Sequence, residues 1–281
     1  MPPLWPLTTM RIGGPARWLV QPDSEQACVA VLDWIKTHDL AHITLGGGAN
    51  VLFPDDGFDG VVVSTRKLKG IQWHGHSVTA GCGESLFGLA SQANRAGWTG
   101  LEWACGIPGT LGGAVVMNAG TSRGDVASVL SSVRVLTVEG ARTLPASELA
   151  LGYRTSALRA GTLQGILLEA TFKLQSDDPR QCLERERKIL SVRAQTQPTG
   201  ASSGCIFKNP TTGAPAGALL DQAGCKGMRV GSAVVSEQHA NFILNESKNN
   251  AADVFILIEH MRQRVLDYHG IALDTEVIVA R

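Results

Sequence analysis

The chain contains a long glycine-rich stretch, Gly106-Ile-Pro-Gly-Thr-Leu-Gly-Gly-Ala-Val-Val-Met-Asn-Ala-Gly120. Pro108 fixes one turn, while Gly109, Gly112 and Gly113 permit positive φ angles or close approaches of the backbone. The stretch fits neither the G-x-G-x-x-G fingerprint nor the P-loop, so the common nucleotide-binding motifs do not apply. A purely structural turn is the alternative. The length of the stretch, and a second glycine-rich loop upstream, favour a large dinucleotide as ligand.

The upstream loop is Leu45-Gly-Gly-Gly-Ala-Asn50, which directly follows a predicted strand over residues 43–45. Three glycines let the backbone come close to a ligand and aim its N–H groups at it. Such an arrangement suits a pyrophosphate, which accepts hydrogen bonds from backbone amides. A mobile turn is the competing interpretation, and the motif alone does not exclude it.

Composition limits the class of protein. The chain has 281 residues, of which 18% are charged and 44% hydrophobic, as in a soluble globular protein of about two domains. Its formal net charge of zero excludes non-specific binding of nucleic acid. An apolar run of about 18 residues, long enough to cross a membrane, is absent from the sequence.

The six cysteines form no Cys-x-x-Cys pair, which argues against a zinc site and against a disulfide framework. His74 and His76 share one strand face, but a solvated pair is favoured over a metal site because no third ligand stands at suitable spacing. We therefore predict no metal. Residues 1–7 lack the features of a signal peptide, so we expect a cytoplasmic protein, and we expect a monomer.

Periodicity predicts both helices and strands. Residues 25–38 follow the helix-start signal Pro22-Asp23-Ser24, and residues 71–73 and 77–80 form a predicted hairpin around Gly75. A charged helix over residues 177–195 marks the predicted main domain boundary. Residues 253–269 form a predicted amphipathic helix with five inward side chains: Val254, Leu257, Ile258, Met261 and Val265.

Three residues outside the glycine-rich loops are candidates for chemistry. Arg154 is a surface arginine or, if buried, a bidentate partner for a carboxylate. Cys205 reads by itself as a small buried core cysteine. Glu276 enters a β-branched strand, at a sheet edge or in a cleft. Each signal alone is weak.

Together these motifs resemble the UDP-N-acetylenolpyruvoylglucosamine reductase (UDP-N-acetylmuramate dehydrogenase) family, in the family's order and over nearly the whole chain. The matching segments are Thr9-Met-Arg-Ile-Gly-Gly-Pro-Ala16, Leu45-Gly-Gly-Gly-Ala-Asn50, Ala104-Cys-Gly-Ile-Pro-Gly-Thr-Leu-Gly-Gly-Ala114 with Asn118, Tyr153-Arg154-x-Ser156, Ser203-Gly-Cys-Ile-Phe-Lys-Asn-Pro210, residues 220–227, Val234-Val-Ser236, His239-Ala-Asn-Phe242 and Glu276-Val277.

The resemblance implies an α+β fold with an FAD-binding domain of the vanillyl-alcohol-oxidase type, built from two α+β subdomains, and a C-terminal α+β domain that binds the substrate. The expected domains are residues 1–66 and 67–178 for FAD and residues 179–281 for substrate. The resemblance also implies FAD and NADPH as cofactors, UDP-N-acetylglucosamine-enolpyruvate as substrate, and a role in building the peptidoglycan of the cell wall.

The resemblance further assigns site residues. The FAD contacts would come from Leu45, Gly46, Gly47, Gly48, Ala49, Asn50, Gly106, Ile107, Pro108, Gly109, Thr110, Gly112, Gly113, Ala114, Asn118 and Gly120. The substrate contacts would come from Lys208, Asn209, Lys226, Gln238 and His239. Arg154, Cys205 and Glu276 match the family's catalytic positions, with Cys205 as proton donor.

Three departures from the family pattern stand out. Cys205 occupies a position where the family usually has serine, and Asn118-Ala-Gly-Thr-Ser-Arg-Gly124 lacks the family's tyrosine. The chain also lacks the extra loop with a gating tyrosine of the longer subtype, so it resembles the shorter, second subtype.

Two other functions compete with this interpretation. A flavin oxidase with another substrate is disfavoured by Lys208, Asn209, Lys226 and Glu276, which match the sugar-nucleotide domain. A non-catalytic protein that binds a UDP-sugar or flavin is allowed by the departures at residues 121–122 and at Cys205. Turnover with dioxygen would favour the first alternative, and tight binding without NADPH oxidation would favour the second.

Overall fold

The computed structural model describes residues 1–247 and 250–280, and the chain divides into two compact units. Unit 1 contains Met1–Trp18, Gly48–Gly60 and Ala194–Arg281, and unit 2 contains Leu19–Gly47 and Val61–Arg193. Unit 1 thus joins both ends of the chain with a short central segment. The domain boundaries expected after residues 66 and 178 stay predictions.

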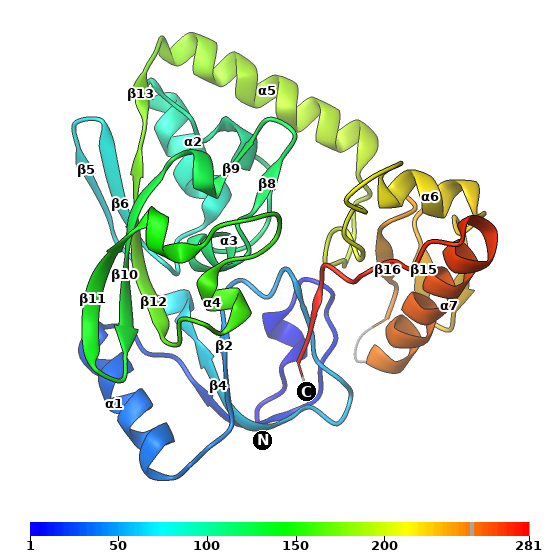
Figure 1. The fold of residues 1–281 in the computed structure, drawn as a ribbon, viewed down its shortest axis with the longest axis horizontal. Coiled ribbons are helices and arrows are strands. Elements are labelled where there is room, and N and C mark those ends of the chain that lie inside the picture. The colour runs from blue at the N-terminus through cyan, green and yellow to red at the C-terminus, as the bar shows by residue number, and fades with distance from the viewer. Residues whose placement is uncertain (248–249, 281) are drawn as a thin grey trace. The chain divides into compact units, whose positions relative to one another are not determined.

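Unit 2 is organised around an antiparallel sheet of five strands in the order β11-β10-β12-β6-β5 (Figure 1). The strands are β5 (Ile71–His74), β6 (Ser77–Gly81), β10 (Leu130–Thr137), β11 (Gly140–Pro145) and β12 (Ile166–Lys173). Burial alternates along β6, where Val78 and Ala80 point into the core, as expected for a strand with one covered face. The hairpin β5–β6 turns at Gly75, whose φ of 58° favours glycine, so the predicted hairpin is confirmed.

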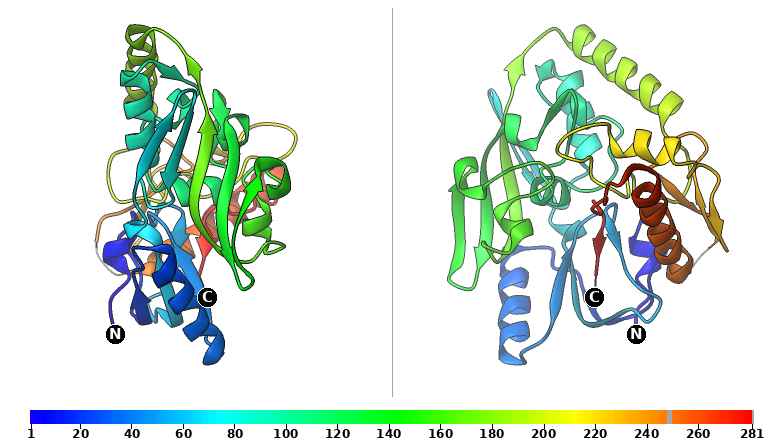
Figure 2. Two further views of the ribbon diagram at one scale, coloured as in Figure 1. Left: turned by 90° about the vertical axis from the view of Figure 1, so that its left-hand side faces the viewer. Right: turned by 45° about the vertical axis from the view of Figure 1, so that its right-hand side comes forward.

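Helices cover this sheet. The helix α3 (Leu111–Val116) contacts β12 and β6, and α1 (Glu25–Thr37) contacts β10. The N-cap of α1 is Ser24, whose side chain accepts a hydrogen bond from the amide of Ala27, which confirms the helix start that the sequence predicted. Figure 2 shows the hairpin β10–β11, in green, from two further directions.

The remaining elements up to residue 196 are short, apart from two helices and β4. The strands are β1 (Ala16–Val20), β2 (His42–Leu45), β3 (Val51–Leu52), β4 (Phe58–Ser64), β7 (Trp98–Thr99), β8 (Gly120–Thr121), β9 (Gly124–Asp125) and β13 (Gln175–Ser176). The α-helices are α2 (Leu86–Arg95), α4 (Ala157–Ala160) and α5 (Pro179–Thr196), and the 3-10 helices are η1 (Trp5–Leu7), η2 (Thr65–Lys67), η3 (Glu102–Ala104), η4 (Val126–Ser128) and η5 (Ala146–Leu149). The loop of residues 46–50 follows β2, which pairs with β4 in parallel.

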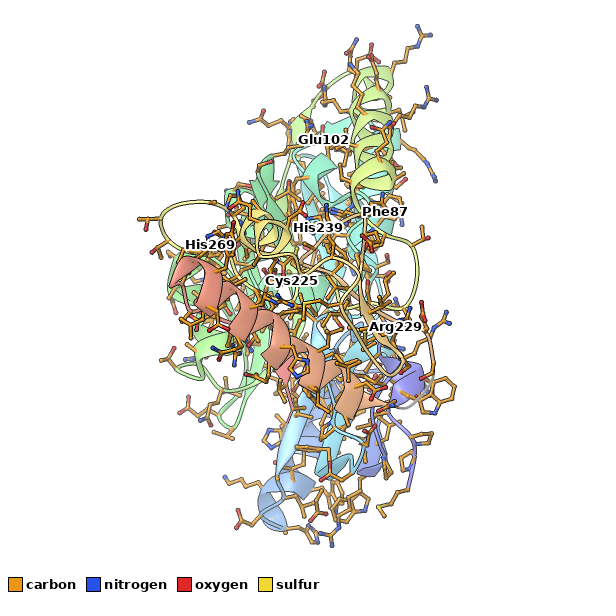
Figure 3. The ribbon with its side chains drawn as sticks, turned by 90° about the vertical axis from the view of Figure 1, so that its right-hand side faces the viewer. Phe87, Glu102, Cys225, Arg229, His239 and His269 are labelled. Carbon is orange, nitrogen blue, oxygen red and sulfur yellow. The ribbon has the colours of Figure 1, made fainter. Side chains whose placement is uncertain are left out.

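Unit 1 has its own hydrophobic core. Its sheet has the order β14-β15-β16, with β14 (Arg229–Val230), β15 (Ala233–Val235) and β16 (Ile243–Asn245), and α6 (Ala216–Gln222) and α7 (Ala251–His269) pack against each other. The five residues of α7 that the sequence predicted to point inward are all buried, which confirms the amphipathic pattern. Figure 3 shows α7 running across this unit, with His269 at its C-terminal end, where the ring nitrogen Nε2 lies 3.1 Å from the carbonyl of Leu219.

The end of the chain returns to the central segment of unit 1. The strand β17 (Ile278–Val279) pairs in parallel with β3, with Ile278 opposite Val51. The strand that the sequence predicted to include Glu276 is shorter and begins at Ile278. Residues 205–207 form isolated bridges instead of a strand, Cys205 with Phe242 and Phe207 with Thr275.

The mixture of helices with mostly antiparallel sheets is the α+β architecture that the sequence predicted. Within residues 1–247 and 250–280, no helix has both the length and the apolar character needed to cross a membrane. Five of the six cysteines are buried, and Cys205 is partly accessible.

Candidate active site

The two glycine-rich loops meet inside unit 2. The backbone N–H of Gly47 donates a hydrogen bond to Oγ1 of Thr110 at 3.1 Å. A Cβ atom on Gly47 would lie 2.6 Å from Cα of Gly109, and one on Gly46 would lie 2.5 Å from Oγ1 of Thr110. Both positions therefore need glycine, because Gly47 packs against the backbone of Gly109 and Gly46 packs against the side chain of Thr110.

A cation that the sequence did not single out supports this contact. Arg66, in the 3-10 helix η2 that follows β4, donates from Nε to the carbonyl of Gly46 at 3.1 Å and from a terminal nitrogen to the carbonyl of Gly47 at 2.9 Å. Burial lowers the pKa of its guanidinium. Arg66 fixes two peptide groups of the loop, and no local sequence signal connects it with a loop about 20 residues away.

The stretch from residue 109 to residue 113 leaves room for a ligand. Gly113 is exposed, and a Cβ atom there would meet only Oγ1 of Thr110 within 4 Å, at 3.7 Å. Gly113 lies in the first turn of α3, where amides have no partner within the helix. The side chain of Thr110, the N-cap residue, makes no capping hydrogen bond because its hydroxyl accepts from Gly47. An open glycine backbone at a helix start fits the diphosphate of a dinucleotide such as FAD.

Gly48 has a different reason to be glycine. Its φ is 66°, and a Cβ atom would come within 1.9 Å of the carbonyl oxygen of Leu7. The carbonyl of Gly48 also accepts a hydrogen bond from the amide of Thr9 at 3.0 Å. In unit 1 this glycine therefore serves the packing of the N-terminal segment.

Asn118 connects the glycine-rich stretch with the segment that carries Arg154. Its Nδ2 donates to the carbonyl of Gly152 at 2.9 Å, and its Oδ1 accepts from the amide of Ala127 at 2.9 Å. Both ends of the side-chain amide are thus used within the protein. Arg154, with a φ of 55°, donates to the carbonyl of Gly120 at 3.0 Å. Within unit 2 the structure brings together three of the predicted site residues: Asn118, Gly120 and Arg154.

Arg154 is partly buried, and its guanidinium carbon lies 5.3 Å from the ring centre of Tyr153. The oxygen of Ser156 donates to the carbonyl of Val116 in α3 at 2.7 Å, which fixes the far side of the same short segment. An arginine held in this way at a positive φ is constrained in its backbone, so its side chain starts from one defined position.

Cys205 and Glu276 belong to neighbouring backbones of unit 1. The amide of Glu276 donates to the carbonyl of Ile206 at 2.7 Å, and Phe207 pairs with Thr275. Asn50, which the sequence placed in the FAD-binding loop, donates from Nδ2 to the carbonyl of Glu276 at 3.2 Å. Two predicted catalytic positions and one predicted cofactor position are thereby collected in this unit.

Three of the predicted substrate-binding residues gather around α6. Oδ1 of Asn209 accepts from the amide of Ala216 at 3.0 Å, at the start of the helix. Lys226 pairs with Asp221 at 2.7 Å. A Cβ atom on Gly217 would lie 3.0 Å from Cε1 of His239, so the imidazole occupies the space beside this glycine.

Burial lowers the pKa of His239, and the charge of Lys226 acts in the same direction. Gln238 is exposed, and its side chain donates to the carbonyl of Ala194 at 3.1 Å. The backbone amide of Lys208 donates to the backbone carbonyl of Asp274 at 2.9 Å. The part of the chain that the structure describes contains no group of three His, Cys, Asp or Glu residues able to hold a metal ion.

Comparison with known proteins extends these observations. Residues 196–280 match the family model described as "UDP-N-acetylenolpyruvoylglucosamine reductase, C-terminal domain", and residues 16–144 match the model described as "FAD binding domain". The UDP-N-acetylenolpyruvoylglucosamine reductase of Gloeobacter violaceus is 41% identical over 275 residues, covering 96% of this chain and 92% of the relative. The enzyme of the same name from Chloroflexus aggregans is 40% identical over 282 residues, covering 97% and 94%.

A solved structure agrees with the sequence relatives. The crystal structure of UDP-N-acetylenolpyruvylglucosamine reductase (MurB) from Thermus caldophilus superposes with a TM-score of 0.84 at 34% identity, covering 99% of this chain and 97% of that one.

Proposed function

The chain belongs to the UDP-N-acetylenolpyruvoylglucosamine reductase family of FAD-dependent oxidoreductases, which carry out the reduction step of peptidoglycan precursor synthesis, and on that premise we propose how its own residues perform this step. NADPH is the reductant, and UDP-N-acetylglucosamine-enolpyruvate is reduced to UDP-N-acetylmuramate. FAD, when bound, would carry the hydride from NADPH to the methylene carbon of the substrate.

The substrate double bond is an enol ether and is rich in electrons, so it resists attack by hydride. Negative charge must develop on the neighbouring carboxylate, and groups placed there in advance lower the barrier. Arg154 binds this carboxylate through its guanidinium. Glu276, protonated, donates a second hydrogen bond to it.

Cys205 delivers the proton to the carbon next to the carboxylate. A thiol with a reference pKa near 8.5 is mostly protonated at neutral pH and is a competent acid. The observation that carries this proposal is the pairing of residues 206–207, which directly follow Cys205, with residues 275–276 of unit 1. Burial raises the pKa of Cys28 to about 11 and of Cys82 and Cys105 to about 12, so these three thiols are weaker acids than a thiol in water.

The remaining assigned residues bind the cofactor or the substrate. The loops that meet at Gly47 and Thr110 hold the FAD diphosphate, with Gly113 open toward it. The sugar nucleotide is bound by the three residues around α6: Asn209, Lys226 and His239. Lys208 and Gln238 contact the edge of the same ligand. We place the enzyme in the cytoplasm and expect a monomer, which size-exclusion chromatography with light scattering tests.

The experiment separates the two half-reactions in a stopped-flow instrument. FAD-loaded wild-type protein is first reduced with NADPH and then mixed with the enolpyruvyl UDP-sugar. Cys205→Ala should be reduced normally and reoxidised more slowly by orders of magnitude, while Cys205→Ser keeps substantial activity. Cys225→Ala, which removes a buried thiol from the same unit, is the matched control and should behave as wild type.

Each failure has its own meaning. Fast reoxidation of Cys205→Ala removes the proton-donor assignment. Reoxidation by dioxygen without any need for the UDP-sugar supports a flavin oxidase. Tight binding of flavin or UDP-sugar without NADPH oxidation supports a binding protein without catalytic activity.

A further inference from the structure

The side chain of Asn241 forms the hydrogen bonds that a neighbouring strand would otherwise form with Phe207, two residues after Cys205. Asn241 is 2% exposed and lies two residues before β16. Its Oδ1 accepts a hydrogen bond from the amide of Phe207, and its Nδ2 donates to the carbonyl of the same residue, both at 2.9 Å. A side-chain amide offers one acceptor and two donors, so it can satisfy both main-chain groups of a residue as a neighbouring strand would.

The main chain of Asn241 adds a third contact. Its carbonyl accepts from the amide of Ile206 at 2.9 Å, while the carbonyl of Ile206 accepts from Glu276 on the other side at 2.7 Å. The two residues that follow Cys205 are therefore held between Asn241 and Glu276. Ile206 and Phe207 are 0% and 1% exposed, so water cannot replace these bonds.

His239 fixes the position of Asn241 in turn. The amide of Asn241 donates to Nδ1 of His239 at 3.2 Å, which requires that nitrogen to be unprotonated. Burial lowers the pKa of the imidazole and so favours its neutral form; a backbone hydrogen bond and Asp221 act in the opposite direction, and the charge of Lys226 adds to the lowering. A series of hydrogen bonds thus runs from His239 through Asn241 to Ile206 and Phe207, and from Ile206 on to Glu276.

We infer that Asn241 is a positioning residue for the reduction: it sets the Cys205 backbone in register with Glu276, so that proton delivery and carboxylate binding act on one substrate. The inference rests on the proposed roles of Cys205 and Glu276. It assigns a function to Asn241 of the segment His239-Ala-Asn-Phe242. The side chain of Asn241 is too deeply buried to contact a substrate directly.

The chain offers a matched control for this residue. Asn245, 7% exposed, lies on β16 in the same unit, and its Nδ2 donates to the carbonyl of Met10 at 2.9 Å. Asn241→Asp and Asn245→Asp keep the size and the acceptor of each side chain, and each removes one donor to a buried carbonyl. Any general loss of stability should therefore be similar in the two variants.

The half-reactions are measured in both FAD-loaded variants. Asn241→Asp should be reduced by NADPH at the wild-type rate, and its reoxidation by the enolpyruvyl UDP-sugar should slow about tenfold, the factor that corresponds to about 1.4 kcal/mol. Asn245→Asp should keep the wild-type ratio of the two rates. Equal ratios in the two Asn variants would overturn the inference.

A second measurement does not depend on turnover. Iodoacetamide should label Cys205 several-fold faster in Asn241→Ser than in wild type, because local opening exposes the thiol, and Asn245→Ser should not change the rate. The serine variants also carry the test if Asn241→Asp does not fold. Unchanged labelling in Asn241→Ser contradicts the inference.

The two proposals fail in different ways. If Cys205→Ala is reoxidised as fast as wild type, the proton-donor assignment fails, and labelling still reports whether Asn241 fixes the Cys205 backbone. If Cys205→Ala is slow while Asn241→Asp keeps the wild-type ratio, Cys205 remains the donor and the positioning role is lost.

Discussion

The backbone amide of Gly47 donates a hydrogen bond to the hydroxyl of Thr110 across 63 residues of sequence, and it thereby joins the two glycine-rich loops of unit 2. The hydroxyl is the N-cap side chain of α3 and makes no bond to its own helix. The loop contact thus leaves the first turn of α3 to a ligand. This relationship predicts that glycines of the two loops fail in different ways when they are substituted.

Gly47→Ala and Gly113→Ala should separate folding from FAD binding. A Cβ atom at Gly47 meets the backbone of Gly109 at 2.6 Å, so the variant should lose about 1–3 kcal/mol of unfolding free energy and bind FAD weakly. A Cβ atom at Gly113 has no contact closer than 3.7 Å, so its apoprotein should be as stable as wild type or slightly more stable. Urea unfolding of the apoproteins, with FAD titration by fluorescence, measures both effects. Unchanged FAD affinity in Gly113→Ala would show that this glycine does not face the cofactor.

Arg154→Lys should impair the substrate half-reaction. Lysine keeps the charge but loses the planar fork that binds a carboxylate with two hydrogen bonds, and it cannot reproduce the geometry of the contact to Gly120 at 3.0 Å. Loss of such a contact costs roughly 100-fold in rate. Stopped-flow reoxidation by the enolpyruvyl UDP-sugar measures it, with Arg123→Lys, at an exposed position in the same region, as control. Equal rates for the two variants would remove Arg154 from the carboxylate.

Glu102→Gln should destabilise unit 2. Burial alone would raise the pKa of this carboxyl group, but hydrogen bonds from Thr99, the amide of Gly100 and Arg185 outweigh burial and lower it. Loss of bonds to a charged group should cost about 1.5–3 kcal/mol at neutral pH. Glu246→Gln, which breaks an exposed pair with Arg229, should change stability little.

The effect of Glu102 should also depend on pH. Because its pKa in the folded protein lies below the reference value of 4.5, its contribution is complete above that pH and is lost as the pH falls through the folded pKa. The difference in unfolding free energy between wild type and Glu102→Gln should therefore shrink in acid. A difference that stays constant down to about pH 3 would contradict the lowered pKa.

His239 should make the folded protein less stable below its reference pKa of 6.5. Burial lowers its folded pKa, so the unfolded chain takes up a proton first as the pH falls, and stability decreases until the folded pKa is reached. Urea unfolding from about pH 7.5 to about pH 5.5 should show a steeper loss in wild type than in His239→Gln. Parallel curves would mean that burial does not lower the pKa of this imidazole.

Local signals in the sequence predicted much of the fold. Ser24 predicted the start of α1, and Gly75 predicted the turn of the β5–β6 hairpin. The five residues of α7 that were predicted to point inward are all buried. Each of these features depends on neighbours within one or two turns of chain. The hairpin partner β11 and the helix α3 were not predicted, because glycine-rich and polar stretches resemble loops until they pack.

The residues of the sequence alone identified both glycine-rich loops and gave Arg154, Cys205 and Glu276 as candidates, and the resemblance to a known family implied the α+β class. The tertiary structure was needed to show that Arg66 donates hydrogen bonds to the carbonyls of Gly46 and Gly47. It was also needed to show that the side chain of Asn241 forms hydrogen bonds with both main-chain groups of Phe207, two residues after Cys205. Such contacts join residues 19 to 34 positions apart through buried polar groups. Their partners are chosen by which donors and acceptors lose water together when the core forms, and no local pattern of residues contains that information.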